Sequence, residues 1–234
     1  MSISTIVNDT ACMAISCRKK ISVALSDDEI RLMMEILTEE FPDPKPALHF
    51  KNAYELLCAV MLSAQATDAS VNQATPQLFA KAPDPKAMVK LGAEGIAPFI
   101  KSIGLWRVKS KNLELMSEQL LQRHHGMVPD DYAALRALSG VGEKTAAVIM
   151  NVIYHKPYIA VDTHIFRVCC RTGLCVGKNA LDVQHALADI IPLQYQNEAH
   201  HRLLYHGRFV CTAKKPDCGH CVLSALCKSR KDFD

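Results

Sequence analysis

The sequence predicts an all-α protein, and three observations carry this prediction. Apolar residues make up 49% of the 234 residues but aromatic residues only 6%, and abundant alanine and leucine are typical of helical proteins. Apolar side chains recur at helical spacing, as in Ile30, Met33, Met34 and Leu37. No segment is predicted as a strand. The formal net charge of +3 permits nucleic-acid binding but does not indicate it, and no apolar run approaches the length of a membrane span.

Start and stop signals place the helices of the first half of the chain. Ser26 and Glu29 form a capping box that begins the first helix, and the proline-rich segment 42–46 ends it. Further helices are predicted from about residue 52 to 61, from 67 or 68 to 79, from 85 to 91, from 94 to 101, and from 108 to 124.

The second half begins with acidic residues at positions 130 and 131, which suit the first turn of a helix ending near Leu138. A glycine-rich turn and a helix from 143 to about 155 follow. Residues 156–161 contain a proline and are predicted to be extended. The remaining helices are predicted from 162 to about 171, from 179 to 190, and from 196 to 210.

The turn at Gly140, Val141 and Gly142 is the first functional signal. Two glycines around one apolar residue let the backbone turn sharply with Val141 pointing inward. Backbone N–H groups then remain free at the start of the next helix, which is a ready anion site. In the absence of a glycine-rich nucleotide loop, we expect the anion to be a nucleic-acid backbone phosphate.

Chain geometry places Asp162 beside Lys144. A helix over 143–155 is about 20 Å long, and six extended residues return about 20 Å. The chain can therefore come back to the turn that it left. A lysine and a carboxylate beside a phosphate-binding turn form a candidate catalytic pair.

Several motifs carry a family resemblance. The segment LSGVGEKTAAVIMNV resembles the helix-hairpin-helix of the DNA glycosylase superfamily. The segments VDTHIFRVCCRTGL and LLCAVMLSAQATD and the C-terminal cysteines are similar to the endonuclease III family, from about Asp27 onward.

The resemblance implies an all-α, two-lobed helix-hairpin-helix DNA glycosylase fold with a C-terminal [4Fe–4S] cluster loop. A six-helix barrel is expected over residues 46–156, with its hairpin at about 132–151. The second lobe is expected to combine residues 26–45 with 157–234. Residues 1–25 are expected to be a flexible extension without assigned function.

Lys144 has two interpretations. Most lysines in a first helical turn are solvated surface residues. Yet the helix dipole and partial burial both disfavour the charged form, and a neutral amine is the nucleophile that attacks a sugar C1′. The resemblance implies that Lys144 is the Schiff-base nucleophile of a bifunctional glycosylase.

Asp162 is a favoured helix N-cap by residue type. A carboxylate held by backbone N–H groups stays ionised, so it can stabilise positive charge on the sugar or help to deprotonate Lys144. The resemblance matches it to the essential aspartate of the family.

Four cysteines form what we call the cysteine set: Cys211, Cys218, Cys221 and Cys227. Four thiolates within 17 residues indicate metal, and their chemistry leaves zinc and an iron–sulfur cluster both open. The resemblance favours a [4Fe–4S] cluster with a structural role, which holds Lys214 and Lys215 toward a phosphate backbone. Without the cluster, the two lysines would be solvated charges.

The six cysteines outside the cysteine set are expected to be reduced thiols in a cytosolic protein: Cys12, Cys17, Cys58, Cys169, Cys170 and Cys175.

The resemblance also implies DNA contacts. Gln65 would fill the gap left by an extruded nucleotide, although a lone glutamine is usually a surface residue. Leu105 matches a second wedge, with core packing as the alternative. His164 is expected either to touch phosphate or to belong only to the helix start. The hairpin contacts would come from Gly140, Val141, Gly142 and Thr145.

The implied function is a bifunctional DNA glycosylase and AP lyase of base excision repair. Its expected partner is double-stranded DNA with oxidised or ring-fragmented pyrimidines or abasic sites. We expect a monomer without membrane contact, cytoplasmic and associated with the nucleoid.

Three alternative functions predict other residues. An adenine-mismatch glycosylase would carry a glutamate within AVMLSAQATD, no hairpin lysine and usually a further C-terminal domain. A thymine- or uracil-mismatch enzyme would replace Lys144, and a catalytically silent DNA-binding or redox-sensing protein would not need Lys144 and Asp162.

Overall fold

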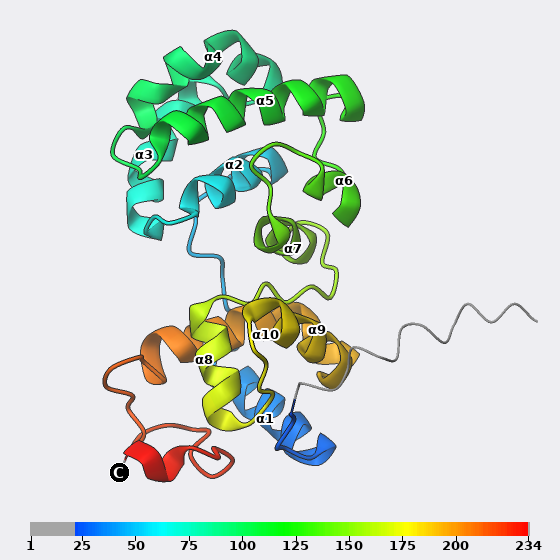
Figure 1. Cartoon of the computed structure of the whole chain (residues 1–234), viewed down its shortest axis with the longest axis vertical. Helices are drawn as coiled ribbons and strands as arrows, with labels where there is room; N and C mark the ends of the chain where they lie inside the picture. Colours follow the sequence, from blue (N-terminus) through cyan, green and yellow to red (C-terminus); the bar gives the residue numbers. More distant parts are fainter. Residues whose placement is uncertain (1–21, 234) are drawn as a thin grey trace, which may run out of the picture.

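The computed structural model describes residues 22–233 of the chain. Its helices form two lobes, one above the other in Figure 1. Within the described range the only β-structure is an isolated bridge between Ser22 and Val176, so the predicted all-α class is confirmed. No helix in this range is both long enough and apolar enough to cross a membrane.

The upper lobe surrounds helix α2, whose residues 54–62 are all buried. A helix that is apolar on every side belongs at the centre of a core, and its neighbours are amphipathic helices that cover it. The helices of this lobe are α2 (Ala53–Ser63), α3 (Asp68–Lys81), α4 (Pro85–Ile100), α5 (Trp106–His124), α6 (Tyr132–Arg136) and α7 (Glu143–Val152).

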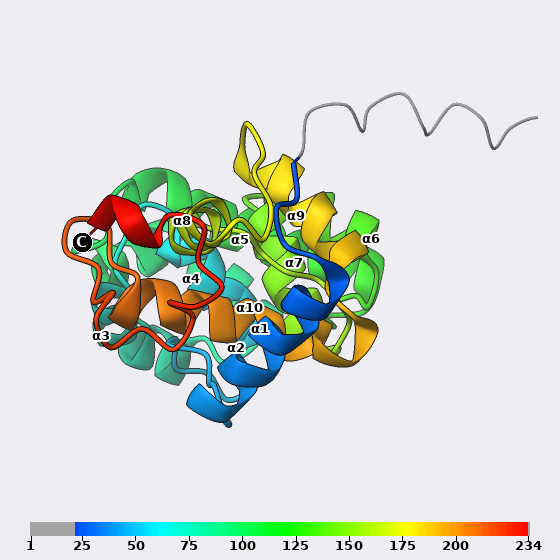
Figure 2. The same cartoon turned by 90° about the horizontal axis from the view of Figure 1, so that it is seen from below.

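The lower lobe joins the N-terminal helix to the C-terminal third of the chain (Figures 1 and 2). Ile30, Met33, Met34 and Leu37 of α1 pack into one core with residues between 159 and 223. The elements of this lobe are α1 (Asp27–Glu40), α8 (Thr163–Thr172), α9 (Ala180–Ile190), α10 (Leu193–Tyr205), a π-helix (His206–Val210) and a 3₁₀ turn (Arg230–Phe233).

Helix α4 covers the two helices predicted at 85–91 and 94–101, and Gly92, with a φ of 67°, breaks it at the predicted interruption. Two other predicted helix ends differ from the structure. Helix α7 ends at Val152, because His155 adopts a left-handed φ of 51° and the Lys156 N–H donates to Met150 O. The last long helix becomes a π-helix from His206 onward.

The expected N-terminal extension lies mostly outside the described residues. Its last residues are not free of the fold, because Ser22 exchanges two backbone hydrogen bonds with Val176 and the Ala24 N–H donates to Gly173 O. Leu25 is buried in the lower core. Packed structure therefore begins before residue 26.

Candidate active site

The turn between α6 and α7 has the geometry that its glycines predict. Gly140 has a φ of 77°, and a Cβ at this residue would lie 2.6 Å from Met61 Sδ. Val141 is 5% exposed and points into the upper core. Glycine at 140 thus combines a left-handed backbone with a close approach to α2 and α5.

Helix α7 starts at this turn without a capping side chain. Gly142 is its N-cap residue, and a Cβ there would have no heavy atom within 4 Å. The Val141 N–H is used within the turn, because it donates to Leu138 O. The first-turn amides of α7 have no partner inside a helix.

Lys144 and Asp162 meet as the chain geometry predicts, with Lys144 Nζ 3.9 Å from Asp162 Oδ2. Asp162 is the N-cap of α8, and its Oδ1 accepts the N–H groups of His164 and Ile165, each at 2.9 Å. The cap uses one carboxylate oxygen and the contact with Lys144 uses the other. The capping interpretation of Asp162 and its pairing with Lys144 therefore hold together.

The two side chains differ in solvent access. Asp162 is 13% exposed and Lys144 is 58% exposed. The lysine is therefore less buried than expected, and its end is accessible to a large substrate. The carboxylate is fixed by its backbone bonds, so the amine is the mobile member of the pair.

Both residues line one open cavity between the lobes. One part of its wall comes from Ser63 at the end of α2 and Asp68 at the start of α3, and another from the start of α8, with His164. The π-helix supplies Arg208, whose Nη2 lies 2.8 Å from Asp68 Oδ2. This ion pair joins the upper and lower lobes across the cavity.

Sequence reasoning missed Asp68 and Arg208 as site residues. Asp68 ends the LSAQATD motif and was interpreted only as a helix start. Arg208 carries no local signal, since its place depends on a π-helix, a rare element that often occurs at functional sites.

Gln65 and Leu105 occupy neighbouring exposed turns. Both have left-handed backbones, with φ values of 55° and 61°. Leu105 is 58% exposed, so it does not have the core-packing role that was its alternative. A Cβ at Gly104 would lie 3.6 Å from Gln65 O, which places the two turns in contact.

The other residues predicted to contact DNA differ in their exposure and in their position relative to the cavity. His164 lines the cavity, but its ring also packs on the π-helix, where Nδ1 lies 3.4 Å from Gly207 O. Thr145 is half-buried in the first turn of α7. Lys214 and Lys215 are exposed in the cysteine loop, whose path is held by Arg171 hydrogen bonds to Thr212 O and Ala213 O.

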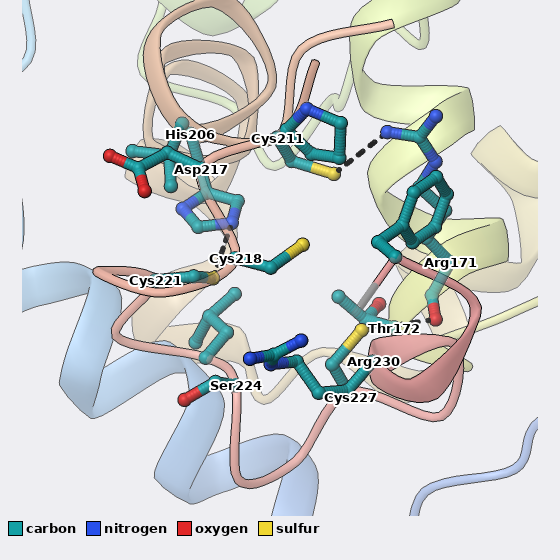
Figure 3. A pocket seen from close by; sticks show the side chains of 14 residues that line it. Arg171, Thr172, His206, Cys211, Asp217, Cys218, Cys221, Ser224, Cys227 and Arg230 are labelled. Carbon is teal, nitrogen blue, oxygen red and sulfur yellow. Dashed lines mark hydrogen bonds between the residues drawn. The ribbon is translucent and has the colours of Figure 1, made fainter. Parts of the chain in front are cut away.

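The cysteine set lines a separate cavity in the lower lobe. Figure 3 shows its side chains around one space, with His206 and Arg171 beside them. Arg171 Nη1 lies 3.5 Å from Cys211 Sγ, and His206 Nε2 lies 3.6 Å from Cys221 Sγ. Nitrogen donors next to thiolate sulfurs are suited to stabilise a bound cluster.

The donor set fits an iron–sulfur cluster. Burial raises the pKa of the Cys221 and Cys227 thiols, so ionised sulfur here requires a compensating positive charge, which iron supplies. Among the described residues, no three His, Cys, Asp or Glu side chains are gathered closely enough for a single ion. The four cysteine side chains lie around one space, with their sulfur atoms available as ligands (Figure 3).

Comparison with known proteins extends over most of the chain. The family model described as HhH-GPD superfamily base excision DNA repair protein matches residues 58–193. A second model, the iron-sulfur binding domain of endonuclease III, matches residues 211–227 and thus spans the cysteine set.

Curated relatives agree with both matches. Endonuclease III of Escherichia coli K12 is 48% identical over 204 residues, which cover 86% of this chain and 97% of the relative. Endonuclease III of Haemophilus influenzae is 45% identical over the same length, with the same coverage.

Solved structures share the fold. A trapped endonuclease III–DNA covalent intermediate, in an estranged-adenine complex, superposes with a TM-score of 0.84 at 40% identity, covering 89% of this chain and 98% of that one. A thermostable thymine-DNA glycosylase superposes with a TM-score of 0.79 at 21% identity, covering 88% and 98%. The second likeness concerns the fold alone.

Proposed function

This chain belongs to the endonuclease III family of the HhH-GPD superfamily, and we propose that Lys144 and Asp162 carry out its reaction. As a family member it is a bifunctional DNA glycosylase and AP lyase of base excision repair, with a [4Fe–4S] cluster. The observation that carries the assignment of residues is the 3.9 Å contact between the two side chains inside the open cavity.

Lys144 is proposed as the nucleophile. Its Nζ forms a bond to C1′ of a nucleotide extruded into the cavity, and the bond between C1′ and the base breaks. The base leaves with the electron pair of that bond and takes up a proton. The loss of a proton from nitrogen and the opening of the sugar ring then give a Schiff base.

Asp162 is proposed to act as an ionised carboxylate. Its Oδ2 faces Nζ of Lys144, so it can stabilise positive charge on the sugar ring and receive a proton from the amine. Two backbone N–H groups hold Oδ1. The carboxylate is therefore oriented before the substrate arrives.

The lyase step follows from the Schiff base. The iminium group acidifies the C2′ proton, and its removal expels the 3′ phosphate by β-elimination, so the strand is cut on the 3′ side of the lesion. Hydrolysis of the imine then releases Lys144. No redox reagent is consumed in either step.

Three surfaces are proposed to hold the duplex. The first-turn amides of α7, with Gly140, Gly142 and Thr145, would bind backbone phosphate. Gln65 and Leu105 would enter the base stack. In the C-terminal loop, the cysteine set would hold the cluster and so fix the backbone. The exposed lysines of this loop would then meet phosphate as well.

We further propose that the substrates are oxidised or ring-fragmented pyrimidines and abasic sites in double-stranded DNA, including DNA of the nucleoid. This proposal is supported by the open cavity, which Lys144 and Asp162 line together. Because both lobes that line it come from one chain, a monomer suffices for activity.

Borohydride trapping on a thymine-glycol duplex tests the proposal. The wild-type protein is expected to form a covalent adduct with DNA, and Lys144→Ala is expected to form none. Lys178→Ala is the matched control, because Lys178 lines the same cavity and is expected to leave trapping intact. Equal trapping by Lys144→Ala would exclude Lys144 as the nucleophile.

A further inference from the structure

Lys109 on α5 is a buried lysine outside the cavity of the catalytic pair. It is 5% exposed, and a charged group that is removed from water requires hydrogen-bond partners. Its Nζ donates to Leu62 O at 2.9 Å and to Ala64 O at 2.7 Å. Burial lowers the pKa of this ammonium group.

The acceptors are carbonyls at the end of α2, which finishes at Ser63 with Ala64 as its C-cap. Carbonyls in the last turn of a helix have no partner within it and lie at the negative end of its dipole. The Lys109 ammonium group donates hydrogen bonds to these carbonyls, and its positive charge lies at the negative end of the helix dipole. It also fixes the backbone immediately before Gln65.

The same residue holds the neighbouring turn through its backbone. The Lys109 N–H donates to Leu105 O at 3.0 Å. One residue thus binds Ala64 with its side chain and Leu105 with its main chain. Gln65 and Leu105 both have left-handed backbones. This conformation is unfavourable for residues other than glycine, so it persists only where the surrounding structure imposes it.

We propose that Lys109 is a positioning residue that fixes the turn of Gln65 against the turn of Leu105, so that both side chains enter the DNA stack together. This inference rests on the proposed function of these two residues. Lys109 touches neither the catalytic pair nor their cavity. Its effect therefore belongs to duplex opening and not to the chemistry at C1′.

The test compares two substrates in Lys109→Met, with Lys111→Met as the matched control, since Lys111 is exposed on the same helix. One substrate carries an abasic site opposite a base in a duplex, and the other carries it in a single strand with no stack to open. Single-turnover cleavage is measured on both, together with circular dichroism of each variant.

Loss of the two hydrogen bonds from Lys109 Nζ to Leu62 O and Ala64 O predicts about a tenfold or greater slowing of Lys109→Met on the duplex. On the single strand its rate is expected to stay within about twofold of wild type. Lys111→Met is expected to match wild type on both. If Lys109→Met does not fold, Lys109→Gln, which keeps an amide donor, is measured in the same way.

Equal slowing on both substrates, or no slowing on the duplex, would overturn the role of Lys109. The same duplex-selective defect in Lys111→Met would also overturn it. Failure of the proposed function has a different signature, because the wild-type protein would then cleave neither substrate.

Discussion

Asp162 presents one carboxylate oxygen to Lys144, at 3.9 Å from Nζ, while its other oxygen caps α8. The cap determines the direction of the side chain, and this direction determines where the free oxygen lies. Asp162 therefore both stabilises the start of α8 and faces the proposed nucleophile. The two contributions can be separated, because they use different oxygens.

Asp162→Asn is expected to separate the cap from the charge. Asparagine is about as good an N-cap as aspartate, so the free energy of unfolding should change by about 1 kcal/mol or less. Borohydride trapping should slow by about 100-fold or more, because the ionised oxygen facing Lys144 is lost. Asp162→Ala should lose about 1 kcal/mol of stability in addition. Wild-type trapping by Asp162→Asn would leave the residue with the capping role alone.

Gly140→Ala and Gly142→Ala are expected to differ although they flank one residue. At Gly140 the new methyl group combines a φ of 77° with a contact of 2.6 Å to Met61, which should cost about 2 kcal/mol or more in thermal or denaturant unfolding. At Gly142 the methyl group meets open space, so stability should change by about 0.5 kcal/mol or less.

Gly142→Ala should instead weaken binding to a duplex with an abasic-site analogue, measured by fluorescence anisotropy. The methyl group stands at the open end of α7, where the phosphate is proposed to approach. Two results would contradict this pair of predictions. One is equal destabilisation by both variants, and the other is wild-type DNA affinity in Gly142→Ala.

Cys218→Ala is expected to remove the iron–sulfur cluster, because three thiolates leave one iron without a protein ligand. Iron content and the visible absorbance of the purified protein should fall, and the loop 211–227 should become sensitive to protease. Cys170→Ala is the control, since this half-buried thiol lies outside the cysteine set. Full iron content in Cys218→Ala would remove this residue from the ligand set.

Local pattern and chain geometry were enough to predict much of this site. Asp162 follows a helix and a return of similar length, so its place beside Lys144 could be calculated, although α7 is shorter than predicted. The pairing of Asp68 with Arg208 could not be predicted, because these residues are far apart in sequence and meet only when the lobes pack together. The role of Lys109 could not be predicted for another reason. The sequence pattern around a single lysine on an amphipathic helix is the same whether its amine reaches solvent or a buried carbonyl.

Buried histidines behind the catalytic pair predict that stability falls in mild acid. Burial, and to a smaller extent the charge of Arg208, lowers the pKa of His201 to about 4 from an ordinary 6.5. His200 packs against its ring and is shifted in the same direction, chiefly by burial. Above the ordinary pKa both states of the protein hold a neutral ring, and stability is complete. Below it the unfolded chain binds a proton that the folded protein does not, so stability falls with pH until the folded pKa is reached.

His201→Gln tests this directly. Between about pH 7.5 and about pH 5.5, the wild-type protein should lose about 1 kcal/mol more unfolding free energy than the variant, because glutamine does not titrate in this range. Chemical denaturation at several pH values, with iron content checked at each, measures the difference. His125→Gln is the control, since this histidine is exposed and should leave the wild-type slope unchanged. Parallel slopes for wild type and His201→Gln would show that His201 binds its proton equally well in the folded and unfolded states.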